Sequence, residues 1–593
     1  MLTRPFGNPE TSTTHLPHNP PETAFKNPNL SQAIAQIISH ECGEVFSLMG
    51  NGNVWFIDAL ETLGHPVVEV RHEVATVASA DAYFRASGKL AVATTTYGPG
   101  YTNAISALAE ASLARIPLIY VVGDAPTSGL RPNDIAQAEM AAACGVPTIY
   151  AHPDVVVDRT YEAIELALQS SKPVVLAIPH DVIRAEVPSA QQQRLANPPQ
   201  VRSPKVPQPQ VDEEVIEEII GARQLLILAG RGARGARKEV TKLAAALGAD
   251  VATSAPMRGF FGRTPGKVYR SPEEVVTEPL PGDSYRNLGV CGGFAAPSTQ
   301  AEMRSADVVL VLGAGLNHFT RAFGDSFAPD ARIIQVDVQA QPTTEIVSRF
   351  IQGGVAEFSH LLYQHVADRA PRRSRAELPQ PVYPQPEEFL GDGRLDPRAL
   401  FSELNEVLPA DRVIVTDGGH FMGWPNMYLD VDGPEQTIMV GTAMQAIGLG
   451  FPSAVGAAKA TASMQPERTV VMVTGDGGGM MGIADAESFI RVARRGVIVV
   501  VNDSAYGAEI HQYAVRGADE RTMRLPEFDF AGMLRPLGAE TMVIRRLADL
   551  AAAREWFRGV REGTLVLDCR VSREVVASFI SEMGKVASAA AGE

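Results

Sequence analysis

The sequence predicts an α/β protein with three doubly wound parallel sheets, one in each of three domains. Short apolar runs with β-strand character alternate with helical patterns along most of the chain, and this alternation is typical of parallel sheets covered by helices on both faces. The 593 residues also exceed what one hydrophobic core usually holds. Two stretches rich in proline and polar residues, 187–210 and 370–392, divide the chain, and we expect them to be extended, solvated linkers.

The three expected domains span residues 27–186, 211–369 and 393–580, between an N-terminal arm over 1–26 and a C-terminal tail over 581–593. They have a similar size and rhythm but no obvious sequence repeat, so the pattern predicts shared architecture only. The expected strands are 66–70, 90–96, 117–124, 224–230, 307–315, 332–338, 412–419, 469–478, 496–503 and 563–569. The expected helices include 73–87, 102–115, 237–248 and 483–495.

Composition excludes several classes of function. The net charge is −16 and no block of the chain is rich in lysine or arginine, which argues against a nucleic-acid or anionic-membrane partner. The four cysteines are scattered without metal-ligand spacing, as in reduced thiols of a cytoplasmic protein. No apolar run has membrane-spanning length, and the polar, proline-rich first residues lack the core of a signal peptide. We therefore expect a cytoplasmic location.

Two acidic residues follow two neighbouring strand-like runs. Asp476 follows the run 469–475 and Asp503 the run 496–502, with a predicted helix over 483–495 between them. One right-handed βαβ unit would bring both carboxylates to the same sheet edge, where open parallel sheets bind ligands. Two hard oxygen ligands suit Mg²⁺, which often shares its shell with phosphates. Nearby glycines would let backbone approach a phosphate: Gly475, Gly477, Gly478 and Gly479.

The stretch "GDGGGMMGIADAESFIRVARRGVIVVVND" resembles the diphosphate-binding signature of thiamine-diphosphate enzymes. Within that family it is similar to the acetohydroxyacid (acetolactate) synthase, pyruvate decarboxylase and benzaldehyde lyase group. The resemblance implies that Asp476, Asp503 and the backbone carbonyl of Ala505 bind Mg²⁺. Asp503 departs from the pattern, because the family usually has asparagine there. The alternative second ligand is Asn502, reached by a one-residue shift of the turn.

A second motif resembles the other half of the same cofactor site. "EVRHEV" is followed by "TTTYGPGYTN" at the family's spacing. The resemblance implies that Glu73 hydrogen-bonds the cofactor's pyrimidine ring, and burial there would raise the pKa of its carboxyl group. It also implies pyrimidine-binding, central and diphosphate-binding domains in that order. In the family the two half-sites come from different subunits, so a homodimer or homotetramer with active sites at the subunit interface is expected.

Further site residues follow from the same resemblance. Asn51, and with it Asn53, would line the reacting carbon, Gln137 would face the substrate, and Glu509 would move protons at the reaction centre, with His511 as an additional candidate that is structural in the alternative reading. Ile447 would be the apolar wedge under the cofactor, and the carbonyl of Gln445 would hold its amino group. The remaining expected cofactor contacts are Gly98, Gly419, His420, Phe421, Gly475, Gly477, Gly478, Tyr506 and Gly507.

The resemblance implies an enzyme that uses thiamine diphosphate and Mg²⁺ to decarboxylate a 2-oxo acid such as pyruvate. The expected outcome is acetolactate synthase-like ligation of the remaining fragment to a second carbonyl compound. Two alternatives stay open: a decarboxylase that releases an aldehyde, and a catalytically silent homologue with a regulatory role. The retained Glu73 and Asp476 argue against the silent homologue.

The central domain contains a separate glycine pattern. Gly230, Gly232 and Gly235 form a GxGxxG between a predicted strand and helix, as in dinucleotide-binding folds. A lone match is weak, and no acidic residue ends the following strand. Related enzymes bind FAD, ADP or nothing in this domain. The stretch "GAGLNHFTRAFG" lacks the "RFDDR"-like run of FAD-containing acetohydroxyacid synthases, so the sequence favours a central domain without FAD.

Overall fold

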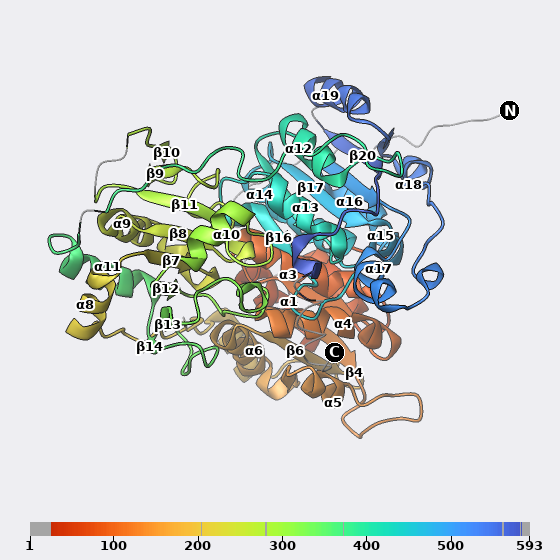
Figure 1. Ribbon diagram of the computed structural model, residues 1–593. Helices are drawn as coiled ribbons and strands as arrows, with labels where there is room; N and C mark the ends of the chain where they lie inside the picture. The colour runs from red at the N-terminus through yellow and green to blue at the C-terminus, as the bar shows by residue number, and fades with distance from the viewer. Residues whose placement is uncertain are drawn as a thin grey trace.

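Three sheets flanked by helices make up the computed structural model (Figure 1), which describes residues 25–202, 204–278, 282–371, 373–559, 562–581 and 583. Within these residues the sheets contain six, eight and six strands. The predicted fold class, three parallel-sheet α/β domains, is confirmed. The expected N-terminal arm and C-terminal tail lie almost wholly outside the described residues.

The first sheet has the strand order β2-β1-β3-β4-β6-β5, and its strand pairs are parallel. Its strands are β1 Val45–Ser47, β2 Val68–Glu69, β3 Val92–Thr95, β4 Leu118–Asp124, β5 Thr148–Tyr150 and β6 Pro173–Pro179. Its helices are α1 Leu30–Glu41, α2 Val54–Thr62, α3 Glu73–Ser87, α4 Pro99–Ala114, α5 Gln137–Ala143, α6 Val156–Ser170 and α7 Ser189–Ala196.

Helix α7 corrects one expectation, because it lies inside the segment 187–210 predicted as an extended linker. Leu195 of α7 is buried, and the Gln191 carboxamide accepts a hydrogen bond from the Val157 N–H at 3.1 Å. Prolines flank this helix and dominate the composition of the segment. The composition therefore predicted a linker, although the short helix α7 packs on the first domain.

The central sheet, at the side of the molecule in Figure 1, has the order β10-β9-β11-β8-β7-β12-β13-β14. Strands β9 and β10 form an antiparallel edge hairpin that the strand–helix alternation did not predict. The strands are β7 Leu225–Ala229, β8 Asp250–Thr253, β9 Val268–Ser271, β10 Glu274–Val275, β11 Tyr285–Val290, β12 Val308–Leu312, β13 Arg332–Asp337 and β14 Arg349–Gln352. The helices are α8 Glu213–Gly221, α9 Arg237–Leu247, α10 Pro297–Arg304 and α11 Val355–Val366.

The third sheet has the order β16-β15-β17-β18-β20-β19, which repeats the order of the first sheet strand for strand. The strands are β15 Arg412–Thr416, β16 Thr437–Met439, β17 Thr469–Gly475, β18 Arg495–Asn502, β19 Glu540–Ile544 and β20 Gly563–Arg570. The helices are α12 Pro397–Val407, α13 Gly423–Tyr428, α14 Gly450–Met464, α15 Asp476–Met481, α16 Ala484–Val492, α17 Gly507–Tyr513, α18 Phe530–Leu534 and α19 Leu550–Gly559. The helix predicted over 483–495 is thus α16, and it ends earlier than expected.

Helices α3 and α14 join the first and third domains closely. The Ser79 hydroxyl donates to the carbonyl of Pro452 at 2.8 Å, and a Cβ at Gly456 would lie 1.9 Å from the Ser79 carbonyl oxygen. Glycine at 456 therefore permits the contact of the two backbones. Within the described residues, no helix combines the length and apolarity needed to cross a membrane.

Candidate active site

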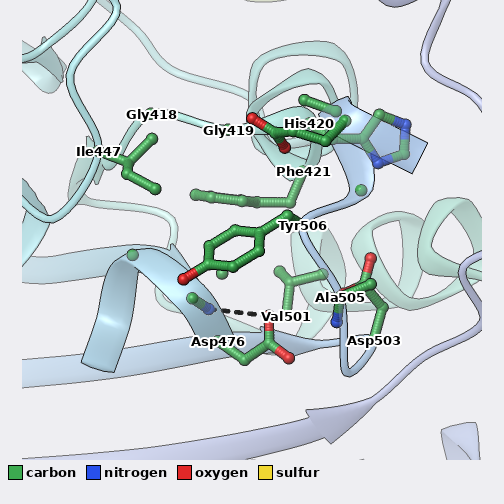
Figure 2. Close-up of a pocket in the computed structure, with 16 residues that line it drawn as sticks. Gly418, Gly419, His420, Phe421, Ile447, Asp476, Val501, Asp503, Ala505 and Tyr506 are labelled. Carbon is green, nitrogen blue, oxygen red and sulfur yellow. Dashed lines mark hydrogen bonds between the residues drawn. The ribbon is translucent and has the colours of Figure 1, made fainter. Parts of the chain in front are cut away.

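A pocket opens at the carboxyl ends of β15, β17 and β18, where the strand order of the third sheet reverses. Open α/β sheets bind ligands at this kind of switch point. The pocket has about 470 Å³ of empty space, and its lining residues all lie between 418 and 509. Figure 2 shows the lining side chains, with the rings of Phe421 and Tyr506 between Ile447 and Asp476. Predicted residues in the lining are Gly419, His420, Phe421, Ile447, Gly475, Asp476, Gly477, Gly478, Asp503, Ala505, Tyr506, Gly507 and Glu509.

Asp476 begins α15 directly after β17 and is 2% exposed. Its Oδ1 accepts a hydrogen bond from the Gly477 N–H at 2.9 Å (dashed in Figure 2), whereas its buried Oδ2 has no hydrogen-bond partner among the described residues. Burial raises the pKa of this carboxyl group to about 6, against the opposing effect of nearby backbone N–H groups. An orphaned buried oxygen of this kind needs a cation or a proton.

Asp503 follows β18 and is 9% exposed. Its Oδ1 accepts a hydrogen bond from the Ala505 N–H at 3.1 Å. Burial raises the pKa of Asp503 well above its ordinary value, and the negative charge of Asp476 raises it further. The two carboxylates thus repel each other across the same pocket, as two ligands of one cation would in its absence.

Asn502, the alternative second ligand, lies on the opposite side of the strand. Its side-chain amide donates to the carbonyl of Phe528 at 2.9 Å and to the carboxylate of Asp568 at 3.1 Å. Successive side chains of a strand point to opposite faces, so Asn502 is turned away from Asp476. The left-handed backbone of Ser504, with φ 59°, makes the sharp turn that follows.

Glycines leave bare backbone around the two carboxylates. A Cβ at Gly475 would lie 2.9 Å from the Phe421 ring, and one at Gly477 would lie 2.6 Å from the Tyr506 ring. Side chains at these positions would displace the aromatic walls of the pocket. Hard oxygen donors, an orphaned carboxylate oxygen and bare peptide backbone together fit a divalent cation carrying a diphosphate.

His420 lies 7% exposed on the far wall of the pocket from Ile447. Its Nε2 accepts a hydrogen bond from the Ala577 N–H at 2.9 Å. Burial, assisted by the neighbouring His511, lowers the pKa of His420 to about 3, so the ring is neutral at physiological pH. Because Nε2 is an acceptor, the proton of the neutral ring resides on Nδ1, which lies 3.2 Å from where a Cβ at Gly507 would be.

His511 and Glu509 lie on α17 beside this wall. The ring centroids of His511 and His420 are 4.7 Å apart, and burial lowers the pKa of His511. Glu509 is exposed and lines the pocket. Of the two, Glu509 is the one placed to meet a ligand from solvent.

Asp417 is a residue of the site whose role the sequence did not predict. It is fully buried at the end of β15, and its carboxylate accepts hydrogen bonds from the N–H groups of Gly418, Gly448 and Leu449 and from the Thr474 hydroxyl, at 2.8–3.2 Å. Burial raises its pKa to about 6. It fixes one end of the loop that carries Ile447. No local sequence signal marks this role, because its partners lie 31 and 32 residues further along the chain.

The first domain places its predicted residues at the equivalent switch point, between β1 and β3. Glu73 begins α3 and is half-buried, and its Oε2 accepts a hydrogen bond from the Asn103 side chain at 3.0 Å. Exposed Asn51 bonds the Thr96 hydroxyl at 2.7 Å and the Tyr97 hydroxyl at 3.0 Å. The expected burial of Glu73 against the cofactor's pyrimidine ring stays a prediction. These residues do not line the pocket of the third domain.

Gln137 and Asn53 have structural surroundings instead of facing an open site. Gln137 is 4% exposed, with its oxygen accepting from the Gly98 N–H at 2.8 Å and its NH₂ donating to the Gly123 carbonyl at 3.0 Å. Both ends of the Gln137 amide therefore hold backbone, and the expectation that Gln137 faces substrate stays a prediction. Buried Asn53 likewise bonds the Gly50 N–H at 2.8 Å.

Family models match both halves of this arrangement. Residues 28–145 match the N-terminal TPP binding domain of thiamine pyrophosphate enzymes, and residues 417–569 match the C-terminal TPP binding domain. The chain therefore matches thiamine pyrophosphate enzymes in both of their TPP binding domains. The first model covers Glu73 and the YGPG turn, and the second covers the pocket with its two carboxylates.

Relatives of known name match most of the chain. It is 25% identical over 566 residues to a sulfoacetaldehyde acetyltransferase of Castellaniella defragrans, covering 88% of each chain. It is 23% identical over 528 residues to the acetolactate synthase isozyme 3 large subunit of Escherichia coli, covering 84% of this chain and 86% of the relative. A thiamine diphosphate-dependent 4-hydroxybenzoylformate decarboxylase from Rhodococcus jostii shares the fold, with a TM-score of 0.72 and 19% identity over 92% of this chain and 99% of that one.

In this chain the GxGxxG of the central domain serves backbone packing. The turn continues as a 3₁₀ helix, Arg231–Ala236, before α9 begins. A Cβ at Gly230 would lie 2.3 Å from the Cα of Ala314, and one at Gly232 would lie 2.8 Å from the Cα of Gly313. The glycines therefore allow the turns after β7 and β12 to touch.

Proposed function

We propose that this protein is a thiamine diphosphate- and Mg²⁺-dependent enzyme that decarboxylates a 2-oxo acid and ligates the remaining fragment to a second carbonyl compound. One observation carries the proposal: two buried, mutually repelling carboxylates stand at a glycine turn, and one of their oxygens has no partner. A bound Mg²⁺ would neutralise both charges and hold the cofactor's diphosphate. When bound, the cofactor supplies an electron sink for the electron pair that decarboxylation releases.

The residues of the third domain would bind and orient the cofactor. Asp476, Asp503 and the Ala505 carbonyl would hold Mg²⁺. Neutral His420 has its proton on Nδ1 and would donate it toward the diphosphate. Ile447 would support the cofactor from the opposite end of the pocket, with the Gln445 carbonyl beside it.

Glu73 would act on the cofactor's other ring. Asn103 occupies Glu73 Oε2, so we assign Oε1 to the proton shared with the pyrimidine. Glu73 does not line the pocket of its own chain, which supports a homodimer in which one subunit's Glu73 serves the partner's pocket. Exposed apolar side chains beside both half-sites support the same assembly: Met49 is 62% exposed and Met481 is 64% exposed.

Product analysis with pyruvate, thiamine diphosphate and MgCl₂ tests the reaction. We expect a ligation product such as acetolactate and loss of turnover in EDTA. Exposed Glu509 at the pocket favours a second candidate, a decarboxylase that protonates the intermediate product and releases an aldehyde. Acetaldehyde without any ligation product would select that candidate. Absence of both products together with no cofactor binding would select a catalytically silent homologue.

The central domain is proposed to function without FAD. The close contact between the Gly230–Gly232 turn and the Gly313–Ala314 turn supports this, because it gives the glycine pattern a role in backbone packing without a nucleotide. The absorption spectrum of the purified protein provides the test, and a flavin absorption band would contradict the proposal.

A further inference from the structure

The loop that carries Ile447 joins β16 to α14, and it has an unusual backbone. Gln445 adopts a left-handed conformation with φ 61°, which side-chain-bearing residues rarely adopt without outside support. The Ala446 N–H donates to the Gly441 carbonyl at 2.8 Å and closes a turn within the loop. What holds the two ends of this turn therefore determines where Ile447 enters the pocket.

A buried carboxylate of the first domain holds the beginning of the loop. Glu110 lies on α4 and is fully buried. Its Oε1 accepts a hydrogen bond from the Ala443 N–H at 3.1 Å, and its Oε2 accepts one from the Met444 N–H at 2.7 Å. Each oxygen thus has its own backbone donor, and hydrogen bonds to a charged acceptor are about twice as strong as neutral ones.

Glu110 is also paired with a cation. The Arg85 guanidinium on α3 lies 4.0 Å from Glu110 and is hydrogen-bonded to Asp81, four residues before it on the same helix. Arg85 and Asp81 are 10% and 1% exposed. The buried carboxylate of Glu110 thus has a hydrogen-bond donor at each oxygen and a guanidinium beside it, so none of its oxygens is left without a partner.

The end of the loop has a matching support inside the third domain, since Asp417 accepts the N–H groups of Gly448 and Leu449. Two buried carboxylates from two domains therefore hold four backbone N–H groups on either side of Gln445 and Ile447. Removing either carboxylate frees one end of the turn and lets the left-handed residue relax.

We propose that Glu110 is a positioning residue that acts through the 443–449 loop to set the place of Ile447 in the pocket. The inference rests on the proposed function insofar as Ile447 is the support of the cofactor. Glu110 also sits on the helix that begins at the YGPG turn. Helix α4 therefore connects the first-domain half-site rigidly to the loop of the third domain.

The first test measures amide hydrogen exchange of the cofactor-free, full-length protein over peptides that cover 440–449. In Glu110→Gln one carboxylate oxygen becomes an NH₂ group facing a backbone N–H, so we expect exchange at Ala443 and Met444 to rise about tenfold or more. Asp250→Asn is the matched control, because Asp250 is 3% exposed and ion-paired with Arg286 in the central domain. Unchanged exchange in Glu110→Gln, or an equal rise in Asp250→Asn, would overturn the inference.

The second test uses thiamine diphosphate with MgCl₂ and follows loss of the cofactor's C2 proton to deuterated solvent. We expect Glu110→Gln to slow this exchange about tenfold while the cofactor Kd changes less than threefold, because the diphosphate contacts are intact. The effect should largely disappear in an Ile447→Ala background, since coupled residues are non-additive. Equal slowing in both backgrounds would show that Glu110 does not act through Ile447.

The two proposals fail in different ways. Wild-type protein that binds no thiamine diphosphate contradicts the proposed function, whereas the amide-exchange test still decides whether Glu110 holds the loop. If Glu110→Gln does not fold, Glu110→Asp keeps the charge but shortens the side chain by one methylene. We expect it to lose protection at one of the two amides, and full protection of both would contradict the inference.

Discussion

Replacing Asp476 with asparagine should stabilise the protein without metal and prevent its stabilisation by metal and cofactor. The reason is the orphaned Oδ2, which is buried without a hydrogen-bond partner in the described part of the chain. At neutral pH the metal-free protein must hold this charge in a buried place, next to Asp503, whose pKa the charge of Asp476 raises. Asparagine keeps an oxygen for the Gly477 N–H and removes the charge.

The size of the effect follows from the pKa of Asp476, about 6 in the folded protein against 3.8 ordinarily. An acid whose folded pKa is raised contributes stability below its unfolded pKa and loses it as the pH rises through the folded value. At about 1.4 kcal/mol per pKa unit, ionising Asp476 costs the metal-free protein about 3 kcal/mol above pH 6. Asp476→Asn avoids this cost, so its advantage is largest at pH 7.5 and fades toward pH 4.

Thermal unfolding in EDTA tests the expected stabilisation of the metal-free variant. Thermal unfolding in MgCl₂ with thiamine diphosphate tests the expected loss of stabilisation by ligands. In EDTA at pH 7.5, Asp476→Asn should unfold several degrees above wild type, at about 2–4 °C per kcal/mol for a domain of this size. At a hundredfold excess over Kd, the ligands should raise the free energy of unfolding of the wild type by about 3 kcal/mol. The free energy of unfolding of the variant should not change. Asp250→Asn, which breaks a satisfied buried ion pair, should be destabilised in both conditions. A less stable Asp476→Asn in EDTA at pH 7.5 would refute the reasoning.

Three further outcomes are expected. Asp503→Asn restores the family's usual residue, so it should stabilise the metal-free protein but raise the Mg²⁺ concentration needed for half-maximal activity; an unchanged Mg²⁺ requirement would point to another ligand. Glu73→Gln should lower kcat by about 10²–10⁴-fold with little change in Tm, measured by steady-state kinetics and calorimetry. Gln137→Leu should lower the free energy of unfolding by about 1–3 kcal/mol, because it leaves the Gly98 N–H and the Gly123 carbonyl unpaired; a change in KM alone would show substrate contact instead.

The fold was predictable because its signal is periodic and local. Strand-like runs such as 469–475 and 496–502 alternate with helices, and that order is typical of parallel sheets. The βαβ rule then brought Asp476 and Asp503 to one edge, as the structure has them. The β9–β10 hairpin and helix α7 were missed because short elements between turn-forming residues carry too few positions for a period to be visible.

The supports of the site were not predictable in the same way. Asp417 lies near the carboxyl end of the predicted strand 412–419, but its role depends on the backbone N–H groups of Gly448 and Leu449, and no residue type in the sequence marks where those groups will lie. The role of Glu110 was not predictable either, because in the sequence it resembles any acidic residue of a helix and its partners are backbone N–H groups far along the chain. Gln137 matched a family position and was assigned to substrate, yet its side chain is buried and bonds the backbone of Gly98 and Gly123. A motif indicates side-chain chemistry, whereas backbone partners decide whether the side chain faces a ligand.

The first and third sheets have the same strand order, and this explains why each of them holds one half-site. Each sheet has one switch point, and each switch point holds one half-site: Glu73 at the first and the carboxylate pair at the third. Their joint action requires a fixed relation between two domains. Glu110 fixes the two domains relative to each other at this point. It lies on α4, which begins at the YGPG turn, and its carboxylate binds backbone N–H groups of the loop that carries Ile447. Removing the hydrogen bonds of Glu110 to this loop should therefore misplace the cofactor without removing any group that touches it.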